Sequence, residues 1–128
     1  MPKWADYKRE AAERGSLALE LFVISTIPSD TPEAMRKILP DHLAYQTKLE
    51  TEGVLFLAGP LSDEAGDEMS GAGLIVYRAN SIEEARQIAE ADPMHAKGGR
   101  TFSVRRWLVN EGSPHIETGL STGKVKLR

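Results

Sequence analysis

The chain contains no cysteine among its 128 residues, which excludes disulfides, thiolate metal sites and cysteine nucleophiles together. No apolar run approaches the roughly 18 residues of a membrane span, and no apolar segment follows Met1–Asp6 to suggest a secretory signal. Basic charge is not in excess either, because 16 Lys and Arg oppose 19 Asp and Glu. A net charge of −3 fits nucleic-acid or anionic-membrane binding poorly. We therefore expect a cytoplasmic protein with neither a nucleic-acid nor a membrane partner.

The common motifs of catalysis and cofactor binding are also missing. There is no Gly-X-Ser-X-Gly elbow and no dinucleotide fingerprint, and Lys97–Arg100 lacks the spacing of a phosphate loop. The acidic segment Asp63–Glu68 lacks the ligand pattern of a calcium loop. The three histidines and their neighbouring acids show no recognised metal spacing. We expect no bound cofactor and no metal.

What the chain does contain is the composition of one ordinary globular domain. At 41% hydrophobic and 27% charged residues, a chain of this length should bury about two thirds of its unfolded surface. Segments rich in Val, Ile, Leu and Phe predict four strands at residues 17–27, 54–60, 71–80 and 101–109. Helical spacing predicts helices at residues 4–14, 31–52 and 81–92.

Local signals mark the ends of the two longer helices. Thr31–Pro32 has an N-cap residue followed by proline at the first helical position, and Ser81–Glu84 is a capping box. Asp92–Pro93 should stop the helix that begins at Ser81. Pro40 lies inside the first long helix, so we expect a kink there or a split into two pieces.

The predicted order is β-α-β-β-α-β, which indicates an α+β ferredoxin-like fold, with a four-stranded antiparallel sheet and two helices on one face. All four strands carry apolar side chains on both faces, and a single helical layer covers only one of them. We therefore expect a second copy to cover the other face, in a homodimer or a larger homo-oligomer.

Three regions are expected along the chain. Residues 1–16 form an N-terminal helical extension, residues 17–110 the ferredoxin-like domain and residues 111–128 a C-terminal tail. The tail ends in Gly123–Arg128, which we predict as a short edge strand.

The main candidate site joins His42 and Asp92. Asp92 stands at the C-terminal end of a helix, where the macrodipole disfavours negative charge, so it needs a nearby donor or cation. His42 follows Pro32 by ten residues and Asp92 follows Ile82 by ten. At 1.5 Å per residue both stand about 15 Å along neighbouring helices, so we expect them to meet. Such a pair serves either as a general base oriented by a carboxylate or only as a buried, satisfied histidine.

Three further residues are weaker candidates for contact with a small-molecule substrate. Tyr45 lies one helical turn from His42 and could donate its hydroxyl, although packing in the core is an alternative. His95 follows the helix stop and offers a second acid or donor, or is a loop residue facing solvent. Arg106 and its neighbour Arg105 point to opposite faces of their strand. Arg106 would bind an anionic substrate or serve as a surface charge.

The order of these motifs resembles the YCII-related family. The first half of the pattern is Leu39–Pro60, with His42–Tyr45 in its helix and Gly59–Pro60 at the end of its strand. The second half is the capping-box helix Ser81–Pro93, followed by a strand that ends in Trp107. The resemblance extends over about residues 17 to 110.

The resemblance implies dimerisation through the sheets into an α+β barrel, and an active site at the helix histidine and the aspartate before proline, here His42 and Asp92. One branch of the family resembles muconolactone isomerases and removes HCl from a chlorinated hydroxyquinol without a cofactor. The chain departs from the family in having Met94–His95 where an aromatic residue is common, and in its N-terminal helix and its tail.

Two functions of different classes follow. The first is a cofactor-independent isomerase or lyase that moves a proton on a small, aromatic or lactone-like, organic acid, with His42 as base and Asp92 as its partner. The alternative is a non-catalytic ligand-binding or interaction module, favoured if Asp92 merely caps a backbone N–H. A heme or flavin monooxygenase of similar fold is a third and weaker hypothesis, because nothing in the sequence marks a cofactor site.

Overall fold

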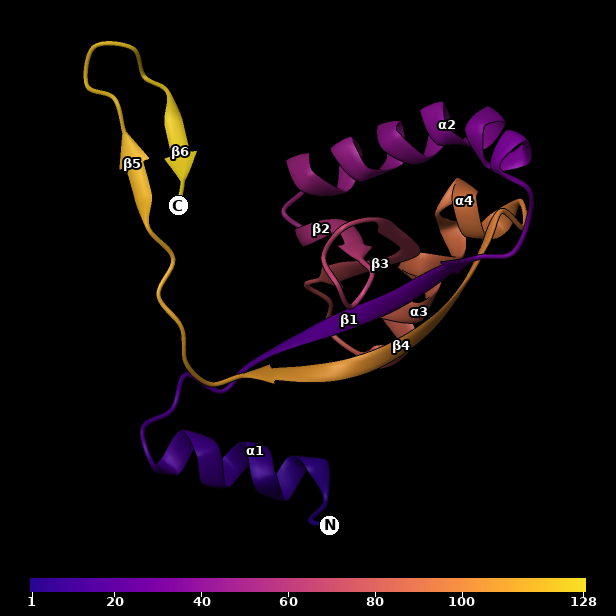
Figure 1. Cartoon of the computed structure of the whole chain (residues 1–128). Helices are drawn as coiled ribbons and strands as arrows, with labels where there is room; N and C mark the ends of the chain where they lie inside the picture. Colours follow the sequence, from indigo (N-terminus) through magenta and orange to yellow (C-terminus); the bar gives the residue numbers. More distant parts are fainter. The chain divides into compact units, whose positions relative to one another are not determined.

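The computed structural model describes the whole chain, Met1–Arg128. Its internal contacts divide it into two compact units. The larger unit is Glu20–Trp107, and the smaller unit combines Met1–Leu19 with Leu108–Arg128 (Figure 1). None of the helices has the length and apolar character needed to cross a membrane.

The larger unit is built on a sheet of four strands. These are β1 (Leu19–Pro28), β2 (Leu55–Ser62), β3 (Met69–Tyr77) and β4 (Arg100–Val109), in the order β2-β3-β1-β4. The central pair β1 and β3 is antiparallel, with Ile24 opposite Ile75, and β2 pairs antiparallel with β3. The predicted α+β fold with a four-stranded antiparallel sheet is therefore confirmed. Pro60, which has no N–H for a ladder, lies in the edge strand β2, where a proline is tolerated.

Helix α2 (Pro32–Thr51) begins where the sequence predicts, because the Thr31 hydroxyl accepts a hydrogen bond from the Ala34 N–H at 3.1 Å. The expected split at Pro40 is absent, and α2 runs through as a single helix. A proline leaves the carbonyl four residues earlier, that of Arg36, without its usual N–H partner. Both residues are exposed, so water can bind that carbonyl and the helix continues.

Helix α3 (Ile82–Ala91) uses the predicted cap, since the Ser81 hydroxyl accepts from the Glu84 N–H at 3.1 Å. The Glu84 carboxylate reaches back to the N–H of Asn80. Asp92 ends α3 as predicted, but a one-turn helix that the sequence did not predict, α4 (Pro93–Ala96), follows at once.

The core lies between the helices α2 and α3 and one face of the four-stranded sheet. Ile24 and Ile75 are opposite each other on β1 and β3, and they form one buried cluster with Tyr77, with Leu49 of α2 and with Ala89 of α3. Because Leu49 and Ala89 belong to the same buried cluster as these strand residues, α2 and α3 pack on the same face of the sheet. This face is the one on which the site is built.

The smaller unit contains α1 (Trp4–Glu13), β5 (Ile116–Thr118) and β6 (Val125–Leu127). The short edge strand predicted within Gly123–Arg128 forms as β6. β6 pairs with β5 in a separate two-stranded sheet, with Glu117 opposite Lys126. The intervening Gly119–Lys124 turn brings the two segments together, so the strand finds a partner close by in the chain.

We expect the core to be sensitive at Ile24, which is 0% exposed, and tolerant at Ile27 of the same strand, which is 54% exposed. Ile24→Ala should lower the free energy of unfolding by about 2–5 kcal/mol, through lost burial and the cavity left behind. Ile27→Ala should change it by about 0.5 kcal/mol or less. Urea unfolding measures both, and equal losses would contradict this placement of the core.

Candidate functional site

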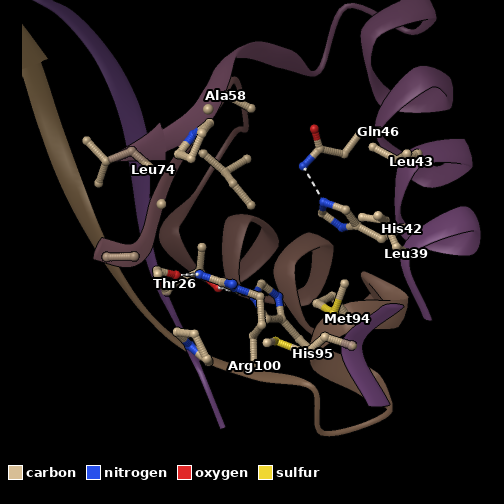
Figure 2. A pocket seen from close by; sticks show the side chains of 18 of the residues that line it. Thr26, Leu39, His42, Leu43, Gln46, Ala58, Leu74, Met94, His95 and Arg100 are labelled. Carbon is tan, nitrogen blue, oxygen red and sulfur yellow. Dashed lines mark hydrogen bonds between the residues drawn. The ribbon is translucent and has the colours of Figure 1, made fainter. Parts of the chain in front are cut away.

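A cavity of about 530 Å³ lies beside α2 in the larger unit (Figure 2). Its walls come from α2, from the β1, β2 and β3 strands, from α4 and from Arg100 at the start of β4. This volume is within the range of pockets that hold small organic molecules.

Helix α2 divides its side chains between the core and the cavity. Ile38 and Leu49 are buried, while Leu39, His42 and Gln46 line the cavity. The cavity residues recur at three- and four-residue intervals, which places them on one face of the helix. Helix α2 therefore contributes side chains to both the core and the cavity.

Small residues on the opposite wall leave the space open. β2 and β3 contribute Ala58 and Gly59 and the run Gly71–Gly73. A Cβ at Gly73 would lie 3.4 Å from both the Gly59 carbonyl oxygen and the Thr26 Cγ2. The wall therefore depends on residues with little or no side chain.

His42 and Asp92 meet as the helix count predicts. The Nδ1 of His42 lies 2.8 and 2.9 Å from the two carboxylate oxygens of Asp92. The Asp92 side chain is 0% exposed and that of His42 is 16% exposed. A carboxylate only accepts, so Nδ1 carries the proton and Nε2 has the free electron pair. That pair accepts from the Gln46 amide nitrogen at 3.1 Å (Figure 2).

The position of Asp92 between two helices explains how its charge is tolerated. It ends α3 and is also the N-cap of α4, where its Oδ1 accepts from the Met94 N–H at 2.9 Å. The helix start of α4 favours a carboxylate, and His42 supplies a second donor. Asp92 thus does both things that the sequence left open, capping a backbone N–H and holding His42.

His95 lines the same cavity. Its Nδ1 lies 2.7 Å from the Ala89 carbonyl oxygen, and its Nε2 lies 2.9 Å from the Thr26 hydroxyl. Because a carbonyl only accepts, Nδ1 donates, and in the neutral ring Nε2 then accepts from the Thr26 hydroxyl. Burial lowers the pKa of His95 below its usual value, against a smaller raising effect of the Ala89 hydrogen bond.

Arg100, at the start of β4, joins His95 and Thr26 in one hydrogen-bonded cluster. Its Nε donates to the Thr26 hydroxyl at 2.9 Å, and its Nη2 donates to the carbonyls of Thr26 and Gly71. The turn before it positions the residue, because Gly98 has φ of +76° and the Gly99 carbonyl accepts from the Ser29 N–H. Burial lowers the pKa of the Arg100 guanidinium.

Sequence reasoning missed Gln46, Thr26 and Arg100. Gln46 follows His42 by four residues, so the helix repeat was a usable signal. Thr26 and Arg100 are 74 residues apart, and only the sheet brings them together.

The structure does not bring Tyr45 and Arg106 to the cavity. Tyr45 packs against the core cluster, and its hydroxyl donates to the Ile88 carbonyl at 2.7 Å, while burial raises its pKa. Arg106 forms an ion pair with Glu20 at 3.3 Å. No group of three His, Asp or Glu side chains is arranged to hold a metal ion.

The chain belongs to the YCII-related domain family, whose model matches residues 4–108. It is 35% identical over 70 residues to the uncharacterized protein YjpA of Bacillus subtilis (strain 168), covering 55% of this chain and 75% of YjpA. Among solved structures it is similar to 5-chloro-2-hydroxyhydroquinone dehydrochlorinase (TftG) from Burkholderia phenoliruptrix AC1100 in complex with 2,5-dihydroxybenzoquinone. That match has 22% identity and a TM-score of 0.48, and covers 68% of this chain and 92% of the dehydrochlorinase.

The lowered pKa of His95 predicts a pH dependence of stability. Between the usual His pKa of about 6.5 and the lower folded value, the unfolded chain binds more protons than the folded chain. The free energy of unfolding should therefore fall as the pH drops below about 6.5. In His95→Gln this loss should be smaller, while the control His115→Gln, exposed in the tail, should behave like wild type. Urea unfolding at several pH values tests this, and parallel curves for wild type and His95→Gln would contradict it.

We also expect Asp92→Asn to reverse the tautomer of His42. The Asn oxygen should stay with the Met94 N–H, so that the amide nitrogen donates to Nδ1 of His42 and moves the imidazole proton to Nε2. Long-range ¹H–¹⁵N NMR at a pH where His42 is neutral distinguishes the two forms. An Nδ1–H tautomer in both proteins would mean that Asp92 does not set it.

Proposed function

We propose that the chain is a cofactor-independent proton-transfer enzyme, an isomerase or a lyase of the dehydrochlorinase type, acting on a small organic substrate. The observation that carries this proposal is the imidazole of His42. Its Nδ1 is fixed by a fully buried carboxylate, and its Nε2 faces a cavity of substrate size. An imidazole held in this way is a general base in the required tautomer.

The first step is transfer of an acidic C–H proton from the substrate to Nε2 of His42. The C–H electron pair remains on the substrate as an enolate, and Asp92 stabilises the imidazolium that forms. In an isomerase, His42 returns the proton to a different carbon. In a lyase, the enolate expels chloride with its electron pair, so that the net loss is HCl.

Gln46 has a defined part in this scheme. In the resting site its amide N–H donates to Nε2, so the substrate C–H must take its place. Once Nε2 carries a proton, rotation of the Gln46 amide presents its oxygen as an acceptor. The same side chain then stabilises His42 in both protonation states.

One observation favours the alternative of a non-catalytic binding module. Both ring nitrogens of His42 are already hydrogen-bonded, to Asp92 and to Gln46, as in a structural histidine. In that case the cavity binds a ligand and leaves it unchanged.

We propose a homodimer as the working form. Apolar side chains of the β2 and β3 strands remain exposed in the single chain, among them Leu57, Leu61 and Leu74. They support this proposal because a second copy would remove them from water.

Deuterium incorporation from D₂O, together with chloride release, tests the proposed reaction on a panel of lactones and chlorinated phenols. A substrate that turns over should lose about 10²- to 10⁴-fold in rate with His42→Gln, because the base is removed. Asp92→Asn should also lower kcat, through the reversed tautomer. His115→Gln is the matched control and should retain full rate. Turnover that persists in His42→Gln, or bound ligands that never exchange, would favour the binding module.

A further inference from the structure

Arg100 is a cation without an anionic partner at the wall of the cavity. Its three hydrogen bonds go to the Thr26 hydroxyl and to the carbonyls of Thr26 and Gly71, all of them neutral groups. None of the ion pairs in the chain involves it, and no Asp or Glu lines the cavity. A guanidinium remains charged in a protein, and charges withdrawn from water are normally paired.

The one carboxylate that acts electrostatically on Arg100, Asp92, is buried and forms no ion pair with it. Asp92 is the one carboxylate whose field acts on Arg100 to raise its pKa, a smaller effect than the lowering caused by burial. The Asp92 oxygens accept from His42 and from the Met94 N–H, and the carboxylate is fully buried. His95 beside Arg100 is neutral and brings no negative charge. The cluster therefore carries one positive charge toward the cavity.

The guanidinium is held in a fixed orientation. Hydrogen bonds from Nε and Nη2 to two strands fix its plane, and these bonds leave the N–H groups of Nη1 to donate to a ligand. A planar donor fixed in advance loses little freedom when a planar oxyanion binds to it. Thr26 links this plane to His95, so the three side chains form one rigid polar cluster.

The rest of the lining restricts what such an anion is attached to. Met35, Leu39, Leu43 and Met94 present apolar surface, and His42 projects from α2 while Arg100 projects from the strand side (Figure 2). A ligand that satisfies both sides has an oxyanion at one end and a compact apolar body reaching toward Nε2 of His42.

We propose that Arg100 is the anchor for the oxyanion of a small organic acid, a carboxylate attached to a compact apolar body. The sequence pointed to Arg106 for this task, but Arg106 is paired with Glu20 and does not line the cavity. As a statement about substrate class this rests on the proposed function, since it places the acid with its apolar body beside the base. As a statement about binding it stands without any reaction.

Benzoate, with benzamide as its neutral isostere, tests the anchor by titration calorimetry and by NMR shift mapping on the intact chain. We expect benzoate to bind at millimolar concentration and to shift the signals of Thr26, Gly71 and Arg100, and benzamide to bind at least tenfold more weakly. Arg100→Gln should weaken benzoate binding by about 10- to 100-fold, the effect expected for a charge-assisted hydrogen bond. Arg105→Gln, an exposed arginine of the same strand, should leave binding unchanged.

Three comparisons keep the outcome decisive. If benzoate and benzamide bind equally to wild type, or if neither binds, the proposal that Arg100 binds the oxyanion is wrong, whether or not Arg100→Gln folds. Arg100→Lys keeps the charge but loses the planar fork, and it should bind benzoate with intermediate affinity. His42→Gln should still bind benzoate, so loss of turnover with retained binding separates the base from the anchor. If His42→Gln retains turnover while benzoate binding still depends on Arg100, the proposed role of His42 as base is refuted and the proposed role of Arg100 in binding is supported.

Discussion

The hydrogen bond from His42 Nδ1 to the buried carboxylate of Asp92 ties the middle of α2 to the junction of α3 and α4. A carboxylate that is fully buried is costly unless each oxygen is satisfied, and here one imidazole and one backbone N–H do this. The same bond fixes which nitrogen of His42 faces the cavity. The local structure at the end of α3 and the chemistry of the site therefore depend on one interaction.

The cavity exists because the strands opposite α2 supply too little side-chain volume to fill the space beside the helix. The side of α2 that carries His42 faces strands in which Gly59 and Gly71–Gly73 supply almost no side-chain volume. Because these residues place no side chains over the sheet, the space above them stays open. Arg100 enters this space from the Gly98–Gly99 turn and brings the charge that the apolar walls lack.

Much of the fold was predictable because its signals are local. The caps at Thr31 and Ser81 and the stop at Asp92–Pro93 act within one helical turn, and the structure uses each of them. The split at Pro40 does not occur, because the effect of a proline inside a helix depends on whether the freed carbonyl is exposed, which is a property of the assembled chain. The partner of the C-terminal strand was not predicted, because strand propensity does not specify which segment a strand pairs with.

The sequence by itself determined the order of the four main strands and of the helices before and between them, apart from the one-turn α4. It also predicted the meeting of His42 with Asp92, because the helix rise converts residue counts into heights along neighbouring helices. Only the tertiary structure decided what surrounds that pair. Gln46 on Nε2, the Thr26–His95–Arg100 cluster and the separation of Tyr45 and Arg106 from the cavity arise from contacts across strands and helices. Such contacts join residues far apart in the chain, and no spacing rule in the sequence records them.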